Sequence, residues 1–338
     1  MTIGTTTRSE PKTALIFGVS GQDGAYLAQL LLGKGYTVHG TSRDREMAGF
    51  VNLRRLAILD RVALHSAVLT DFRSVVEVIA RIRPTEIYNL AGQSSVGLSF
   101  EQPVETLNGS IGGTLNILEA IRFLKLDTRF YNAASSECFG NTGDRPADEA
   151  TLFHPRSPYG VGKAAAFWAV ANYREAYGLF ACSGILFNHE SPLRPARYVT
   201  QKVVRGAADI AERKTDRLTL GALDIARDWG WAPEYVDAMH RMLAHPEPED
   251  FVIATGETHK LEEFVAEVFS RFGLDWRLHV DTDSGLMRPS DISRSVGNPG
   301  KARRLLDWEA QTRMTEMVTR LVEAERRRRR AEQQAGTA

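Results

Sequence analysis

TALIFGVSGQDG, residues 13–24, decides the fold of this chain. Residues 13–17 form a short apolar run, as expected of a parallel strand that is buried on both faces. Three glycines follow at every third position, where they allow a tight turn. A helix pattern over 26–32 leads to a second strand over 36–41, so the chain opens as strand, glycine turn, helix and strand.

This opening unit is typical of the dinucleotide-binding fold. The pyrophosphate of a dinucleotide lies at the N-terminus of the helix in such a unit, because free backbone N–H groups and the helix dipole attract an anion there. The glycine spacing is G-x-x-G-x-x-G, and its position between a strand and a helix makes it a strong indication. We expect cofactor contacts at Gly18, Gly21, Gln22, Asp23 and Gly24.

Strands and helices continue to alternate at the spacing of a parallel sheet. Strands are predicted over 62–69, 86–92, 129–134 and 179–187, and helices over 72–83, 114–125 and 159–177. The second half adds helices over 200–212, 233–243 and 260–272 and short strands over 218–220 and 251–254. We predict an α/β fold, a Rossmann-type doubly wound parallel sheet with a smaller C-terminal substrate-binding lobe.

The predicted domain boundaries follow the change in the second half of the chain, where the strands become short. The Rossmann domain covers 12–190, and 224–255 returns to it. The substrate-binding lobe covers 191–223 and 256–325. Residues 1–11 and 326–338 are predicted to be flexible tails. The second tail begins with an arginine run, which we interpret as the solvated end of a helix.

Composition excludes several classes of partner. Lysine plus arginine equal aspartate plus glutamate at 42 each, so the net charge is zero and gives no reason to expect nucleic acid or a membrane. No apolar run reaches membrane-spanning length, and no signal peptide is recognised. Cys138 and Cys182 lie in apolar segments without metal-ligand spacing. We expect free thiols, no metal and a cytoplasmic location.

Four residues indicate acid–base chemistry. Tyr159 and Lys163 share one face of a helix, and the lysine ammonium is expected to lower the pKa of the phenol. Ser135 and Glu137 follow a predicted strand at its carboxyl end, where ligands bind in open parallel sheets. Ser135 could share the oxygen that Tyr159 deprotonates, and Glu137 adds a second base, so the site suits two proton transfers. A tyrosine packed over a lysine stem is the plainer alternative.

Arg43 bears on the choice of cofactor. It follows the second strand, where an acidic residue would hold the ribose of NAD. A cation at this position suits the 2′-phosphate of NADP, whereas the next residue, Asp44, would favour NAD. An ordinary surface arginine is the alternative, and our prediction is NADP.

Together these residues resemble the extended short-chain dehydrogenase/reductase family and, within it, the GDP-mannose 4,6-dehydratase family. The resemblance runs from about residue 12 to about residue 324. Its most specific stretches are 18–24, 153–160, 184–192 and 227–230. By the motifs of the family, the catalytic set falls on Ser135, Glu137, Tyr159 and Lys163.

The resemblance implies a lyase with tightly bound NADP that converts GDP-mannose to GDP-4-keto-6-deoxymannose. Tyr159 would take the O4 proton while C4 gives a hydride to NADP. Glu137 would take the C5 proton and help water to leave from C6, to which the hydride returns. Further expected cofactor contacts are Leu69, Leu90, Ala91, Tyr159 and Lys163. The expected substrate contacts are Ser94, Asn188, Lys202, Arg227, Arg288 and Asp291. The resemblance also implies a homodimer through helices 114–125 and 159–177, with a homotetramer as the alternative.

Some positions depart from the family pattern, namely Phe17, Asp44, Val68, Ser95, Ala222 and Ala226. They bear on cofactor preference, tetramer formation and the nucleotide base, and they leave the catalytic set intact. Two rival functions stand beside the dehydratase. One is a nucleotide-sugar 4-epimerase or 4-ketoreductase, which needs no base at C5, and the other is a non-catalytic NADP sensor. Fucose, rhamnose or an amino sugar could each follow from the same ketone.

Overall fold

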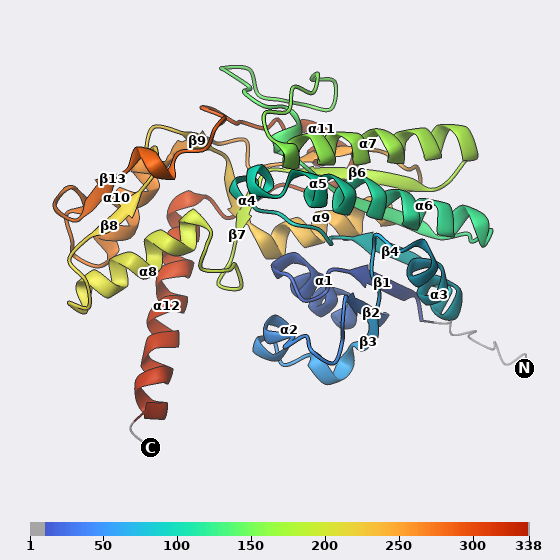
Figure 1. Cartoon of the computed structure of the whole chain (residues 1–338), viewed down its shortest axis with the longest axis horizontal. Helices are drawn as coiled ribbons and strands as arrows, with labels where there is room; N and C mark the ends of the chain where they lie inside the picture. The colour runs from blue at the N-terminus through green and yellow to red at the C-terminus, as the bar shows by residue number, and fades with distance from the viewer. Residues whose placement is uncertain (1–10, 337–338) are drawn as a thin grey trace, which may run out of the picture.

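The computed structural model describes residues 11–336, and a seven-stranded parallel sheet lies at its centre (Figure 1). The strand order is β3-β2-β1-β4-β5-β6-β11. The strands are β1 (Thr13–Phe17), β2 (Thr37–Ser42), β3 (Ala63–Ser66), β4 (Glu86–Asn89), β5 (Arg129–Ser135), β6 (Ala181–Leu186) and β11 (Phe251–Ile253). The order changes direction between β1 and β4, so the sheet is doubly wound, as the sequence predicts.

Helices cover both faces of the sheet. One face carries α1 (Gln22–Gly33) and α9 (Ala232–Ala244), and the other carries α3 (Phe72–Ile82), α6 (Gly113–Phe123) and α7 (Pro158–Tyr177). Side chains of β1 alternate between the two faces. Ala14 and Ile16 join the core that includes α1 and α9, whereas Leu15 and Phe17 join the core that includes α3 and α6. This double burial explains why β1 is apolar throughout.

A smaller lobe lies beside the sheet, on the left of Figure 1. It consists of α8 (Val199–Ala211), α10 (Leu261–Arg271), α12 (Met314–Gly336) and the parallel pair β8 (Leu218–Leu220) and β13 (Val280–Thr282). The apolar faces of the three helices enclose a core of their own, which includes Val204, Phe264 and Leu321. The lobe therefore has its own packing and does not depend on the apolar surface of the sheet.

Short strand pairs connect the lobe to the sheet. β10 (Trp229–Trp231) pairs with β7 (Asn188–Glu190) and leads into α9, which returns the chain to β11. β9 (Ala226–Arg227) pairs with β12 (His259–Lys260). The remaining helices are α2 (Val51–Arg55), α4 (Val96–Glu101), α5 (Pro103–Leu107) and α11 (Gly300–Leu306).

The C-terminal helix differs from the prediction. Residues 326–336 belong to α12, so the expectation of a flexible tail is wrong for them, while 1–10 and 337–338 lie outside the described residues. The reason is electrostatic: Arg329 is buried and pairs with Glu325 on its own helix and with Asp209 and Glu212 at the end of α8. None of the helices within 11–336 has both the length and the apolar character that a membrane crossing requires.

Candidate active site

The glycine loop after β1 fits the phosphates of a dinucleotide. Gly18 has a φ of +86°, and a Cβ there would lie 2.8 Å from the backbone nitrogen of Ala91. A Cβ on Gly24 would overlap the carbonyl oxygen of Gly18. α1 begins after Gly21 without a side-chain cap, so its first N–H groups remain available to an anion. The loop therefore lies where the sheet changes direction and holds a backbone cradle for a pyrophosphate.

The other expected cofactor residues divide into two groups. Leu90 and Ala91 lie against Gly18 at the end of β4, and Leu69 lies against Gly113 at the start of α6. The side chains of Gln22 and Asp23 turn away toward β7, where both contact His189. Only the backbone of these two residues remains for a cofactor.

Arg43 and Asp44 lie just beyond β2 and differ in their partners. Arg43 is exposed and makes no ion pair among residues 11–336. The Asp44 carboxylate accepts hydrogen bonds from the backbone of Glu46 at 2.9 Å and of Met47 at 3.2 Å. Asp44 thus stabilises its own turn, while the guanidinium of Arg43 remains available.

The structure brings the four expected catalytic residues together. Ser135 ends β5, a short 3-10 turn (Ser136–Cys138) holds Glu137, and Tyr159 lies in the first turn of α7. A Cβ on Gly160 would lie 2.8 Å from the carbonyl oxygen of Glu137, so glycine there lets α7 approach the turn. The Lys163 ammonium donates to the carbonyl oxygen of Ala133 at 2.7 Å and lies 5.9 Å from the centre of the Tyr159 ring.

Burial controls the proton affinities of this group. Burial raises the pKa of Tyr159, and the hydrogen bond with Ser135 opposes this effect. Burial also lowers the pKa of Lys163 to about 8. The prediction that Lys163 lowers the pKa of Tyr159 is therefore wrong for this structure, because loss of solvent outweighs any nearby charge and the ammonium is bonded to Ala133.

Glu137 has the properties of a second base. Burial raises its pKa above the usual value, while Arg227 and Arg288 oppose this rise. A carboxylate with a raised pKa is a stronger base than an exposed one. The site therefore holds two different proton acceptors, a phenol and a carboxyl group.

Three expected substrate residues form one cluster near Glu137. The Asp291 oxygen Oδ1 lies 3.0 Å from the Arg227 guanidinium and 3.2 Å from that of Arg288. Arg227 is buried and also donates to the carbonyl oxygen of Ile292 at 2.7 Å. Two guanidinium groups held by one carboxylate present further N–H donors, which match the oxygens of a phosphate.

The remaining expected substrate residues have other partners. Asn188 begins β7, where it pairs with Trp229. The Lys202 ammonium donates to the carbonyl oxygen of Thr219 at 2.7 Å, within the lobe. The Ser94 hydroxyl lies 2.7 Å from the Tyr198 hydroxyl.

Two residues beside Tyr159, Arg194 and Tyr198, were not predicted from the sequence. The Arg194 guanidinium lies 3.8 Å from the centre of the Tyr198 ring, and both residues interact electrostatically with Tyr159. Arg194 belongs to the stretch Asn-His-Glu-Ser-Pro-Leu-Arg-Pro, and Tyr198 comes three residues after it. The stretch follows a buried strand and predicts only a loop. The sequence feature that could have indicated them is the high density of polar residues directly after that strand.

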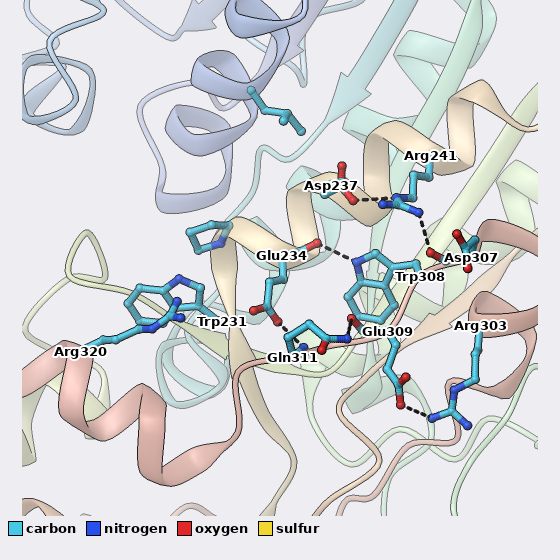
Figure 2. A pocket seen from close by; sticks show the side chains of 12 residues that line it. Trp231, Glu234, Asp237, Arg241, Arg303, Asp307, Trp308, Glu309, Gln311 and Arg320 are labelled. Carbon is cyan, nitrogen blue, oxygen red and sulfur yellow. Dashed lines mark hydrogen bonds and ion pairs between the residues drawn. The ribbon is translucent and has the colours of Figure 1, made fainter.

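One cavity among the described residues lies away from this site. It measures about 630 Å³ and lies between α9 and the segment that joins α11 to α12 (Figure 2). Its polar groups pair with one another: Trp308 donates to the carbonyl oxygen of Glu234, the Glu234 carboxylate accepts from Gln311, and Arg241 pairs with Asp237. It is the junction between the lobe and the sheet and contains none of the catalytic residues.

Comparison with known proteins gives a consistent result. Residues 15–321 match the family described as GDP-mannose 4,6 dehydratase. GDP-mannose 4,6 dehydratase 2 of Arabidopsis thaliana is 44% identical over 92% of this chain and 86% of its own length. The fold resembles dTDP-glucose 4,6-dehydratase from Bacillus anthracis in complex with NAD (TM-score 0.81, 18% identity, 94% and 97% coverage). It also resembles RMD from Pseudomonas aeruginosa complexed with NADPH (TM-score 0.76, 22% identity, 93% and 98% coverage).

Proposed function

We propose that this chain, which belongs to the GDP-mannose 4,6-dehydratase family, removes water from GDP-mannose to give GDP-4-keto-6-deoxymannose, with NADP as its bound cofactor. Members of this family are hydro-lyases, and the reaction class is nucleotide-sugar 4,6-dehydration. The single observation that supports the proposal best is Glu137, a buried carboxyl group of raised pKa beside the Tyr159–Lys163 pair. A 4-epimerase or 4-ketoreductase would have no use for this second base.

The proposed reaction divides the proton transfers between Tyr159 and Glu137. A nicotinamide cofactor, when bound, would supply the redox chemistry, namely removal of the C4 hydride and its return to C6. Tyr159 takes the O4 proton, and Ser135 hydrogen-bonds the same oxygen. The new C4 ketone makes the C5 proton acidic, so Glu137 can remove it and protonate the C6 hydroxyl as it leaves as water. After a proton returns to C5, the sugar has lost one water and the cofactor is unchanged.

Arg43 and Asp44 support NADP over NAD. The free Arg43 guanidinium can pair with a 2′-phosphate, and charged hydrogen bonds of this kind are strong. An NAD-selective carboxylate would have to accept from the ribose hydroxyls, but the Asp44 carboxylate already accepts from Glu46 and Met47.

The substrate's diphosphate has a natural partner in Arg227 and Arg288. Their guanidinium groups are fixed by Asp291 and lie near Glu137, the base that acts on the sugar. We assign Asn188 to the same diphosphate, Ser94 to the sugar and Lys202 to the nucleotide, on the strength of the family resemblance. The lobe would then close over the nucleotide while the sheet holds the cofactor.

Exposed aromatic residues on α7 support a homodimer. Trp168 is 62% exposed and Tyr177 52% exposed, and Phe123 at the end of α6 is 66% exposed. Large apolar side chains that gather on the outer faces of two adjacent helices commonly mark an interface. The buried free thiols of Cys138 and Cys182 agree with a reducing compartment, for which we propose the cytoplasm.

The function is tested by incubating the purified chain with GDP-mannose and catalytic amounts of NADP, with products read by mass. We expect the loss of one water per sugar and no net change in the cofactor. dTDP-, CDP- and UDP-hexoses serve as controls and should react poorly. If the reaction required stoichiometric NADPH, the dehydratase proposal would be wrong and the enzyme would be a reductase.

A further inference from the structure

Asp23 and His189 form a buried pair behind the cofactor loop. Asp23 lies in the first turn of α1, and His189 lies in β7. The His189 atom Nε2 lies 2.9 Å from the Asp23 oxygen Oδ2, and Nδ1 lies 2.7 Å from the carbonyl oxygen of Phe187. The two residues are 166 positions apart in the sequence, so only the tertiary fold brings them together.

The partners of the ring decide its charge. A backbone carbonyl only accepts hydrogen bonds, so Nδ1 must carry a proton. An ionised carboxylate also only accepts, so Nε2 must carry a second proton, and His189 is an imidazolium. The shared proton stays on the imidazole because a histidine has a much higher intrinsic proton affinity than an aspartate.

The surroundings favour the same charge state. The His189 ring stacks on Tyr235, with centres 4.5 Å apart and planes 25° apart, which suits a cation over an aromatic face. The nearby His189 imidazolium and its hydrogen bond hold the pKa of Asp23 down at about 2 against the effect of burial, and the same pairing raises the pKa of His189. The other titratable or charged groups around the pair are Tyr26 on α1, Tyr131 on β5, Lys163 on α7 and Arg194 after β7.

The pair connects the two halves of the proposed site. The Gln22 side chain strengthens this connection, because it donates to the carbonyl oxygen of His189 at 3.2 Å and accepts from the Ser191 hydroxyl at 2.7 Å. The first turn of α1 carries the phosphate cradle, while β7 carries Asn188. The cradle and the substrate strand are therefore held to each other by one ion pair and two hydrogen bonds.

We propose that Asp23 and His189 are positioning residues: their ion pair fixes the cofactor cradle to the strand that carries the substrate contact, without either side chain touching the cofactor. This proposal rests on the proposed dinucleotide site. Breaking the pair frees the start of α1 from β7, so the cofactor should bind more weakly while Tyr159 and Glu137 keep their own surroundings.

The pair should also give cofactor binding a pH dependence with a defined sign. Because the pKa of His189 is raised by folding, the pair is complete below the histidine's ordinary value and is lost as the pH rises through the folded value. Cofactor affinity should therefore fall as the pH rises through the folded pKa of His189.

The test uses the full chain labelled with ¹⁵N-histidine and titrated with NADP, followed by intrinsic fluorescence. In the wild type, His189 should show both ring nitrogens protonated at pH 7. Asp23→Asn preserves the shape and can donate to a neutral Nε2, so His189 should become neutral and the Kd for NADP should rise roughly tenfold. His189→Gln should weaken NADP binding to a similar degree, and in Asp23→Asn the alkaline loss of affinity should disappear.

His279→Gln is the matched control. His279 also bonds a backbone carbonyl through Nδ1 and stacks on a phenyl ring, but the carbonyl belongs to Asp216 of the lobe. This variant should bind NADP as the wild type does. A neutral His189 in the wild type at pH 7, or an unchanged Kd in Asp23→Asn, would overturn the proposal. The wild-type measurements need no variant to fold, and none of the measurements needs dehydratase activity, so failure of the proposed function would be seen separately.

Discussion

Glu137 and Tyr159 act on different protons in the proposed reaction, so their variants should fail at different steps. Glu137→Gln keeps the shape but cannot take the C5 proton, so C4 oxidation should proceed and reduced cofactor should accumulate. Dehydration should fall by about 10²–10⁴-fold, the usual scale for one general base. Tyr159→Phe should block the first step and give no near-ultraviolet signal of reduced cofactor. Oxidised cofactor in both variants would show that Glu137 positions the sugar instead.

The two shifted ionisations predict the pH profile of kcat/KM. Glu137 must be ionised to act, and its raised pKa places the acidic limb above the ordinary glutamate value. Lys163 must be protonated to bind and orient the cofactor. Its pKa of about 8 therefore places the alkaline limb near pH 8. Lys163→Arg should move that limb upward by about one pH unit or more, because arginine stays protonated. An alkaline limb that stays near pH 8 in this variant would exclude Lys163 as its source.

Arg43 should decide the preference between NADP and NAD. Arg43→Ala removes the cation expected at the 2′-phosphate, so NADP binding should weaken by about 1.5–3 kcal/mol, the range for a charged hydrogen bond. NAD, which lacks that phosphate, should bind almost as before. Titration of both cofactors with both proteins gives the comparison, and equal losses for NADP and NAD would assign Arg43 a general structural role.

At the scale of elements, the approach of α7 to the Glu137 turn determines the geometry of the site. Ser157 caps α7 by accepting from the backbone of Gly160 at 3.0 Å, which fixes where the helix begins. Gly160 itself lets the first turn of α7 lie against the carbonyl oxygen of Glu137. The small size of Gly160 therefore allows Tyr159 and Glu137 to lie close together.

Gly160→Ala should separate these two elements without unfolding the chain. The new Cβ would begin 2.8 Å from the Glu137 carbonyl oxygen, a distance too short for a Cβ contact, so α7 or the turn must move. Displacements on the order of 1 Å can reduce turnover about 100-fold, and we expect a loss of kcat approaching that size. Gly97→Ala in α4 is the control, because nothing lies within 4 Å of its added Cβ. Equal activity of both variants would show that the close approach is not required.

At the scale of the whole molecule, the outer face of α7 predicts assembly. Trp168→Glu places a charge at an apolar position that is 62% exposed, so a dimer formed through this face should dissociate to monomers. Light scattering at micromolar concentration should find a dimer for the wild type and a monomer for the variant. Leu286→Glu, on the lobe, is the control and should remain a dimer. A monomeric wild type would refute the proposed interface.

The sequence alone determined the parts of this protein that depend on neighbouring residues. Burial of β1 on both faces requires a continuous apolar run, and the cradle after it requires glycines at fixed spacing, so both are readable from residues 13–24. Glu137, Tyr159 and Lys163 could be proposed as neighbours in one site because strand ends and helical spacing are local properties. The parallel, doubly wound sheet followed from the alternation of strands and helices.

Only the tertiary structure decided the interactions between distant segments. Asp291 is 64 residues from Arg227, and Asp23 is 166 residues from His189, so no local pattern pairs them. Burial, which raises the pKa of Tyr159, depends on every element packed around the phenol, and a four-residue spacing says nothing about it. The end of α12 is also decided by tertiary contacts. Its charged run resembles a solvated tail in the sequence, but it is ordered because Arg329 pairs with the carboxylates at the end of α8. Charge pairing and loss of solvent are set by the complete fold, whereas periodicity and turn chemistry are written in the chain.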